Sequence, residues 1–246
     1  MSAVPPDVLK ELAPTGAMRV AINQGNTVLV QKDPATGAPQ GITVDLAQAL
    51  AERLGVRAEL IVFDTAGKVF EALKAGRLDL AFLAIEPVRA AEIEFTAPYV
   101  QIEGVFMVRA DSPIRTVAEV DRPGQRIAVS QGSAYDLYLT RTIKHATLVR
   151  TTSGPEAMAM FVRDGLEVGA GIRQQVSDFL RHHPQLRLIE PAFMTIRQAM
   201  GAPKGRLAGA AYLSAFIEEQ KAAGFIAAAL KRSGQSESLA APPAGS

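Results

Sequence analysis

The chain has 246 residues, of which 48% are hydrophobic, so it is long enough for one large domain or two small ones with a real core. Its formal net charge of +1 and its lack of a basic run argue against nucleic acid or an acidic membrane as a partner. The absence of cysteine excludes disulfides, thiolate metal sites and cysteine catalysis, and no apolar stretch reaches the roughly 18 residues that a membrane span needs.

The N-terminal segment, residues 1–17, contains an amphipathic stretch at 7–13 but no apolar core of a signal peptide. Two interpretations stay open from this observation. Either the chain is a mature exported protein that was given a new methionine, or the protein stays in the cytosol.

The first half of the chain alternates strands and helices. The patterns predict strands at 17–22, 57–63 and 78–85 and helices at 43–54 and 67–75. This order predicts right-handed crossovers and a parallel sheet. Asn23 and Asn26 follow the first strand, in a loop at its carboxyl end, which is the usual place of a ligand crevice in such sheets.

The same rhythm restarts after a long strand at 100–109. The patterns predict strands at 126–130, 147–150, 166–172 and 186–189 and helices at 134–144, 154–163 and 174–182. Residues 193–199 should return to the first half, and helices over 207–232 close it. A helix end and a glycine precede a buried strand in both halves, at Gly76 and Gly165, which indicates a weak internal repeat.

These patterns predict an α/β fold of two lobes connected by a hinge. Lobe 1 comprises residues 1–107 and 197–232, lobe 2 comprises residues 108–196, and the Ser/Ala/Pro/Gly-rich tail 233–246 is expected to be disordered. A ligand would bind in the cleft between the lobes, with hinge closure around it.

Arg89 is the strongest single candidate for ligand binding. The apolar run Leu80–Ile85 predicts a buried strand, and Glu86 and Pro87 end it at the start of a short helix. An arginine where a strand turns into a helix can form an anion site, because a guanidinium offers a planar fork that matches a carboxylate. The alternative is that Arg89 is a solvated residue that pairs with Glu92 or Glu86.

Four segments resemble the family-3 extracellular solute-binding proteins, the amino-acid-type substrate-binding subunits of ABC importers. They are Gly-Ile-Thr-Val-Asp-Leu-Ala at 41–47, Ala-Gly-Arg-Leu-Asp-Leu at 75–80, Pro-Val-Arg-Ala at 87–90 and Glu-Phe-Thr-Ala-Pro-Tyr at 94–99. The resemblance covers roughly residues 17–232. It implies the two-lobed periplasmic-binding-protein fold of type II, with a mostly parallel sheet flanked by helices in each lobe. It also implies a periplasmic or extracellular monomer whose partners are a small carboxylate or anion and an ABC transporter permease.

The resemblance also places the ligand site. The arginine of the family's Thr-Pro-Glu-Arg turn, which commonly holds the ligand carboxylate, falls on Arg89, and the family's Gln-Gly-Ser/Thr loop falls on residues 131–133. Ser133 could instead only cap the following helix, together with Asp136. The expected ligand-binding residues are Asn23, Asn26, Leu83, Ala84, Arg89, Gln131, Gly132, Ser133, Ala134 and Arg173.

Several positions depart from the family pattern. The aspartate that usually pairs with the ligand ammonium falls on Ile172, the usual aromatic residues fall on Asn26 and Ala66, and a usual hydroxyl residue falls on Ala84. We therefore expect a small anion or carboxylate without an α-ammonium, held by Arg89, the helix at Ser133 and Arg173. Arg173 could equally be a surface residue.

No catalytic residue, cofactor or metal is expected. His145, His182 and His183 lie in exposed-looking contexts without metal-ligand spacing. The rival functions are a cytosolic sensor or orphan binding protein and an enzyme similar to cyclohexadienyl dehydratases, for which Glu86 is the only plausible acid beside Arg89.

Overall fold

The computed structural model describes residues 4–244, which divide into two compact units. Unit 1 contains residues 4–101 and 197–244, and unit 2 contains Ile102–Ile196. The first crossing comes earlier than the expected residue 107. The reason is that β7 (Val100–Arg109) pairs with β10 (Val168–Ile172) from Gly104 to Met107, and this ladder ties the middle of β7 to unit 2.

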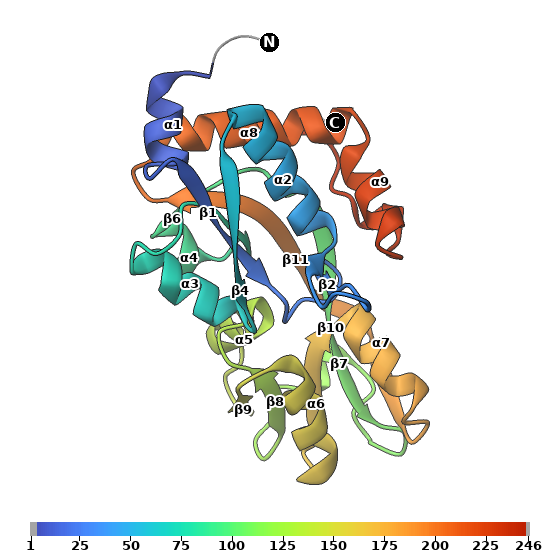
Figure 1. Ribbon diagram of the computed structural model, residues 1–246. Coiled ribbons are helices and arrows are strands. Elements are labelled where there is room, and N and C mark those ends of the chain that lie inside the picture. Colours follow the sequence, from blue (N-terminus) through green and yellow to red (C-terminus); the bar gives the residue numbers. More distant parts are fainter. Residues whose placement is uncertain (1–3, 245–246) are drawn as a thin grey trace. The chain divides into compact units, whose positions relative to one another are not determined.

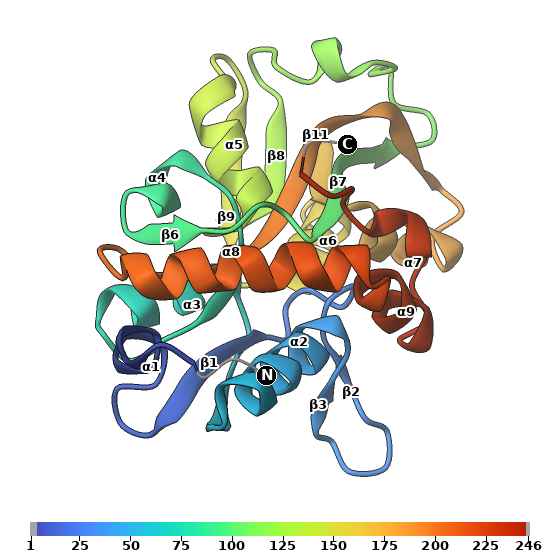
Figure 2. The ribbon, with the colours of Figure 1, turned by 90° about the horizontal axis from the view of Figure 1, so that it is seen from above.

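Unit 1 combines a parallel pair of strands with an antiparallel group, in which the end of β11 (Leu186–Pro203) pairs with two further strands, and helices lie against these strands (Figures 1 and 2). Its elements are α1 (Pro6–Leu12), β1 (Ala17–Asn23), β2 (Gln31–Lys32), β3 (Pro39–Gln40), α2 (Ile42–Leu54), β4 (Arg57–Phe63), α3 (Ala66–Lys74), β5 (Ala81–Ala84), α4 (Pro87–Ala90), β6 (Ile93–Phe95), α8 (Leu207–Ala222), α9 (Phe225–Arg232) and the 3-10 turn η2 (Glu237–Leu239). Strands β1 and β4 pair in parallel, and a parallel bridge joins Val20 to Leu80, just before β5. The predicted β-α-β-α-β order is therefore confirmed.

One buried apolar cluster of unit 1 lies between α3 and the strands. Helix α3 turns the same face inward along its length, because its apolar residues recur at helical spacing. The buried cluster consists of Ala21, Val69, Ala72, Leu73, Leu78, Ala81, Leu83 and Ile93. On α2, the helix ends at Gly55, whose φ of 67° is the left-handed conformation that a glycine C-cap favours.

Unit 2 repeats the alternation on a smaller scale. Besides β10 and most of β7, its elements are η1 (Val117–Glu119), β8 (Arg126–Ser130), α5 (Ala134–Thr142), β9 (Thr147–Thr151), α6 (Gly154–Arg163), α7 (Arg173–Arg181) and the first part of β11 (Leu186–Pro203). Strand β8 pairs in parallel with β9 and β10, whereas β7 is antiparallel to β10. Helix α6 packs on β8 and β10 (Figure 1), with Phe161 fully buried.

Two expectations about the C-terminal half are wrong. The strand expected to end at residue 189 continues to Pro203 as β11, because Pro191 removes one N–H donor without ending extended backbone. The tail is not disordered over residues 233–244. There, the Ala241 amide donates to the Tyr99 carbonyl at 2.9 Å, and the Ala241 side chain is buried. The expectation for residues 245 and 246 lies outside the described residues.

The two units share an arginine-glycine-acid arrangement. In unit 1, Arg19 on β1 donates its backbone N–H and Nε to one oxygen of Asp79 and its Nη2 to the other, while Nη1 donates to the Gly76 carbonyl. In unit 2, Arg126 on β8 likewise donates its backbone N–H and Nε to one oxygen of Glu167, while its Nη2 donates both to the other oxygen and to the Gly165 carbonyl. The predicted internal repeat is thus confirmed at the level of hydrogen bonds.

Candidate functional site

Arg89 lies on α4, the four-residue helix that follows β5, and its side chain is only 1% exposed. Its Nη1 donates to the Ala84 carbonyl at 3.1 Å, which folds the guanidinium back toward the end of β5. Arginine is almost never fully buried unless its charge is compensated. The interpretation of Arg89 as a solvated helix residue is therefore wrong.

The electrostatics of Arg89 follow from its burial and from Glu86. Burial lowers the pKa of Arg89 to about 10, and the nearby Glu86 carboxylate partly offsets this effect. Because this pKa remains well above 7, the guanidinium keeps its charge at neutral pH. Glu86 itself is only 4% exposed, so unit 1 holds a buried charge of each sign at the end of the same strand.

The predicted strand residues Leu83 and Ala84 lie on β5 and are buried. Ala84 contributes its carbonyl oxygen, which accepts the Arg89 bond, and its methyl side chain leaves space where the family pattern has a hydroxyl. These two residues therefore position Arg89 and can offer apolar surface, but no side-chain hydrogen bond.

Asn23 and Asn26 are both used in local turns of unit 1. The Asn23 Oδ1 accepts from the Gly25 amide at 3.1 Å, and the Asn26 Oδ1 accepts from the Val28 amide at 3.2 Å. Each carboxamide oxygen already accepts one backbone bond, and the Nδ2 group of each side chain is a donor that can be offered to a ligand. Donors of this kind suit an anionic oxygen.

In unit 2, the loop Gln131–Ser133 connects β8 to α5. The Ser133 Oγ accepts from the Asp136 amide at 3.1 Å, so the predicted cap is confirmed. In a capping box, the side chain at Asp136 would accept from the backbone N–H of Ser133 itself. Here the Asp136 carboxylate accepts instead from the amide of the preceding residue, Gly132, at 2.8 Å. Asp136 is buried and forms an ion pair with Arg150 at 2.9 Å.

The Asp136 carboxylate makes the start of α5 less favourable for an anionic ligand. It places one of the protein's own negative charges in the first turn of the helix, where the free N–H groups would otherwise favour an anion. Gln131 donates its backbone N–H to the Thr151 carbonyl, and Ala134 is buried at the start of the helix. Whether these loop residues contact a ligand remains a prediction.

Arg173 differs from its expected role. It begins α7, and its Nη1 and Nη2 donate to the two carboxylate oxygens of Glu190 at 2.6 and 2.7 Å, while its Nε pairs with Glu103. A guanidinium held by two carboxylates has little affinity left for a third anion. The sequence pattern could not predict this triad, because the three residues come from three separate elements of unit 2.

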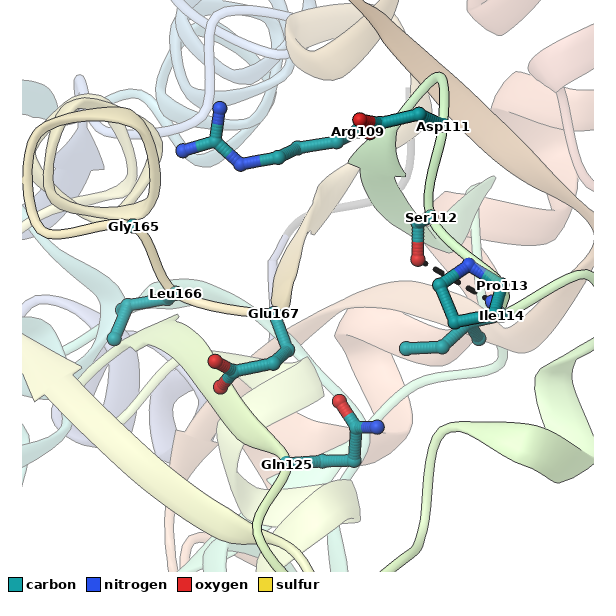
Figure 3. Close-up of a pocket in the computed structure, with 9 residues that line it drawn as sticks. All are labelled: Arg109, Asp111, Ser112, Pro113, Ile114, Gln125, Gly165, Leu166 and Glu167. Atoms are coloured by element: carbon teal, nitrogen blue, oxygen red, sulfur yellow. Dashed lines mark hydrogen bonds between the residues drawn. The ribbon is translucent and has the colours of Figure 1, made fainter.

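Unit 2 also contains a cavity of about 340 Å³ that includes none of the predicted ligand residues (Figure 3). It is lined by Arg109, Asp111, Ser112, Pro113, Ile114, Gln125, Gly165, Leu166 and Glu167. The Glu167 carboxylate on its wall is held by Arg126, so it is part of the shared arrangement described above. We assign this cavity no role in the predicted site.

A comparison with protein families matches residues 18–235 to the bacterial extracellular solute-binding proteins, family 3. A solved ancestral amino acid-binding protein, described as a precursor of cyclohexadienyl dehydratase, superposes with a TM-score of 0.75 at 21% identity. It covers 91% of this chain and 98% of that one. The two-lobed α/β fold expected from the sequence is confirmed by these matches.

Two curated relatives are longer proteins. The membrane-bound lytic murein transglycosylase F of Maricaulis maris (strain MCS10) is 31% identical over 188 residues, which are 74% of this chain and 41% of that protein. The virulence sensor protein BvgS of Bordetella pertussis (strain Tohama I / ATCC BAA-589 / NCTC 13251) is 30% identical over 138 residues, 56% of this chain and 11% of that protein. The chain therefore spans less than half the length of these relatives. Between residues 4 and 244, no helix has the length and apolar character that crossing a bilayer requires.

Proposed function

Because the chain belongs to the bacterial extracellular solute-binding proteins of family 3, we propose that it captures a small carboxylate-bearing solute through Arg89. The observation that carries this proposal is the burial of a charged guanidinium, 1% exposed, at the end of β5. A buried arginine is costly to maintain, and perturbed ionisable groups cluster at functional sites. A carboxylate is the natural partner, because it can accept two parallel hydrogen bonds from the guanidinium fork.

The remaining contacts that we propose come from both units. In unit 1, the amide donors of Asn23 and Asn26 hydrogen-bond the solute, and Leu83 and Ala84 provide apolar surface. In unit 2, the solute contacts Gln131, Gly132, Ser133 and Ala134. Arg173 is left out of this set because Glu103 and Glu190 hold its guanidinium.

We further propose that the chain delivers the bound solute to an ABC transporter permease. Membership of the extracellular solute-binding proteins of family 3 supports this proposal.

The test is the variant Arg89→Gln, with Arg77→Gln as its control, because Arg77 is exposed in the same unit. A thermal-shift panel of carboxylates, amino acids and phosphate- or sulfur-containing acids identifies the solute first. At a ligand concentration of about 100 times Kd, binding adds about 2.7 kcal/mol to the stability, which a melting curve detects easily. We expect Arg89→Gln to abolish this shift and Arg77→Gln to keep it. An unchanged shift in Arg89→Gln contradicts the proposal.

A sensory role is the second candidate, and the BvgS match supports it. In that role the same solute would bind, but the solute-bound chain would regulate a signalling domain rather than deliver the solute to a permease. The complete native gene distinguishes the two roles. An attached enzymatic or signalling region favours a sensor, and a neighbouring permease gene favours transport.

Turnover of prephenate tests the enzymatic alternative. Glu86 would be the general acid in that case, since it is buried beside Arg89. We expect binding without turnover, and a Glu86-dependent release of product would assign the chain to the enzymes instead.

A further inference from the structure

Asp136 is a buried carboxylate in the part of unit 2 where we propose that a negatively charged solute binds. Its side chain is only 5% exposed and lies in the first turn of α5. Like charges repel, and the repulsion is strong where little water screens it. An anion at the loop Gln131–Ser133 is therefore opposed by the protein's own charge unless another residue compensates Asp136.

Arg150 on β9 provides a compensating charge. Its Nε donates to the Asp136 Oδ1 at 2.9 Å, and its Nη2 donates to the Thr140 Oγ1 at 2.8 Å. The Thr140 hydroxyl in turn donates to the Asp136 carbonyl at 2.7 Å. The guanidinium is thus fixed at two points of α5, and the charges of Arg150 and Asp136 sum to zero.

The same strand also holds the loop that precedes α5. The other oxygen of Asp136, Oδ2, accepts from the Gly132 amide at 2.8 Å. Next to Arg150 on β9, the Thr151 carbonyl accepts from the Gln131 amide at 2.9 Å. The end of β9 therefore holds Gln131 directly and Gly132 through Asp136.

We propose that Arg150 is a positioning residue of the solute site, which neutralises Asp136 and fixes it against Gly132, so that the loop accepts a negatively charged group. Arg150 acts through Asp136 rather than by contact with the solute. The inference rests on the proposed function, because it takes residues 131–134 as solute contacts. It adds to that set a residue to which the family resemblance does not point.

A set of substitutions separates this charge effect from a purely structural one. Arg150→Gln and Arg150→Met leave Asp136 uncompensated, whereas Arg150→Lys keeps the positive charge. The double variant Asp136→Asn/Arg150→Gln removes both charges and keeps a carboxamide oxygen that can accept from the Gly132 amide. The control is Arg163→Gln, which removes an arginine of the same unit that pairs with the exposed Asp164. Melting curves confirm that each variant is folded.

Isothermal calorimetry on the full chain measures the affinity. The probes are succinate, L-lactate, L-glutamate and inorganic sulfate, together with any acid that gives a thermal shift, and the variants are compared on each probe that binds the wild type. At about 20 mM NaCl we expect Arg150→Gln and Arg150→Met to bind about 10-fold more weakly, the order for one unit charge at close range in a partly screened site. At about 500 mM NaCl the loss should shrink to about 3-fold or less, because salt screens charges that are partly exposed. Arg150→Lys, the double variant and Arg163→Gln should stay within about 3-fold of the wild type.

Other results overturn the inference. If the uncharged Arg150 variants bind as tightly as the wild type or more tightly, Arg150 does not support an anion site. If the double variant is as weak as Arg150→Gln, or if the loss is the same at both salt concentrations, the ion pair only maintains the structure of the loop. These results leave the proposed function intact, provided that Arg89→Gln still abolishes binding. If no acid binds the wild type, the proposed function fails and the inference fails with it.

Discussion

The variant Asp79→Asn probes the ion-pair cluster that holds β1, the start of β5 and α8 together in unit 1. The Asp79 side chain is fully buried and receives hydrogen bonds from Arg19 at 2.8 Å and from Arg206 at 2.9 Å. Removing one partner of a buried ion pair costs about 3–5 kcal/mol. Since Arg19 and Arg206 remain 25% and 23% exposed and can regain water, we expect a loss near the lower end, about 3 kcal/mol.

The matched control is Glu167→Gln, which removes the corresponding charge in unit 2. The Glu167 and Arg126 side chains are 33% and 44% exposed, and exposed pairs contribute little. We therefore expect its loss of stability to be less than a third of that for Asp79→Asn. Melting curves measure both, and about 3 kcal/mol corresponds to a drop of about 6–12 °C for Asp79→Asn. Equal losses in the two variants would refute the argument that burial decides the contribution of this motif.

The pH dependence gives the same prediction a second test. Burial acts to raise the pKa of Asp79, but the hydrogen bonds from Arg19 and Arg206 outweigh it and place this pKa below its usual range. An acid with a depressed pKa stabilises the fold above its unfolded pKa, about 3.9, and this contribution is lost as the pH falls through the folded value. The stability difference between wild type and Asp79→Asn should thus be constant near pH 7 and shrink below about pH 4.

Three further predictions concern the other unit and the tail. Arg173→Ala should change solute affinity by less than about 3-fold, because Glu103 and Glu190 already hold this guanidinium; a loss of binding in calorimetry would restore Arg173 to the site. Gly132→Ala should lower the unfolding free energy by about 1–2 kcal/mol in urea titrations, because Gly132 has a φ of 70°, whereas Gly154→Ala, at a glycine without positive φ, should not. In hydrogen exchange, the Ala241 amide should be protected, because it donates to Tyr99; exchange as fast as that of the exposed loop at Gly124 would show that the tail is undocked.

The regular elements could be predicted because their signals are local. Strands β7 and β8 and helix α6 have the bounds expected from the sequence, since each is a periodic or apolar run closed by a turn residue. The end expected for β11 at residue 189 is wrong, because the residues after it, Pro191 among them, give no local signal that extended backbone continues to Pro203. The docking of Ala241 was missed for a related reason. A small apolar residue in a Ser/Pro/Gly-rich tail gives no signal of its distant partner Tyr99.

The candidate site could be predicted only in part, because contacts between residues distant in the sequence give no local signal. Its arginine could be found from the turn that carries it, but the charges that surround an arginine decide what it can bind, and these come from elsewhere in the chain. Burial lowers the pKa of Arg89, and the Glu86 carboxylate three residues earlier in the chain partly offsets this effect. Arg173 pairs with two acids, Glu103 and Glu190, which lie 70 and 17 residues away. The sequence predicted both arginines as ligand contacts, whereas folding pairs Arg173 with two exposed carboxylates and leaves Arg89 almost fully buried at the end of β5.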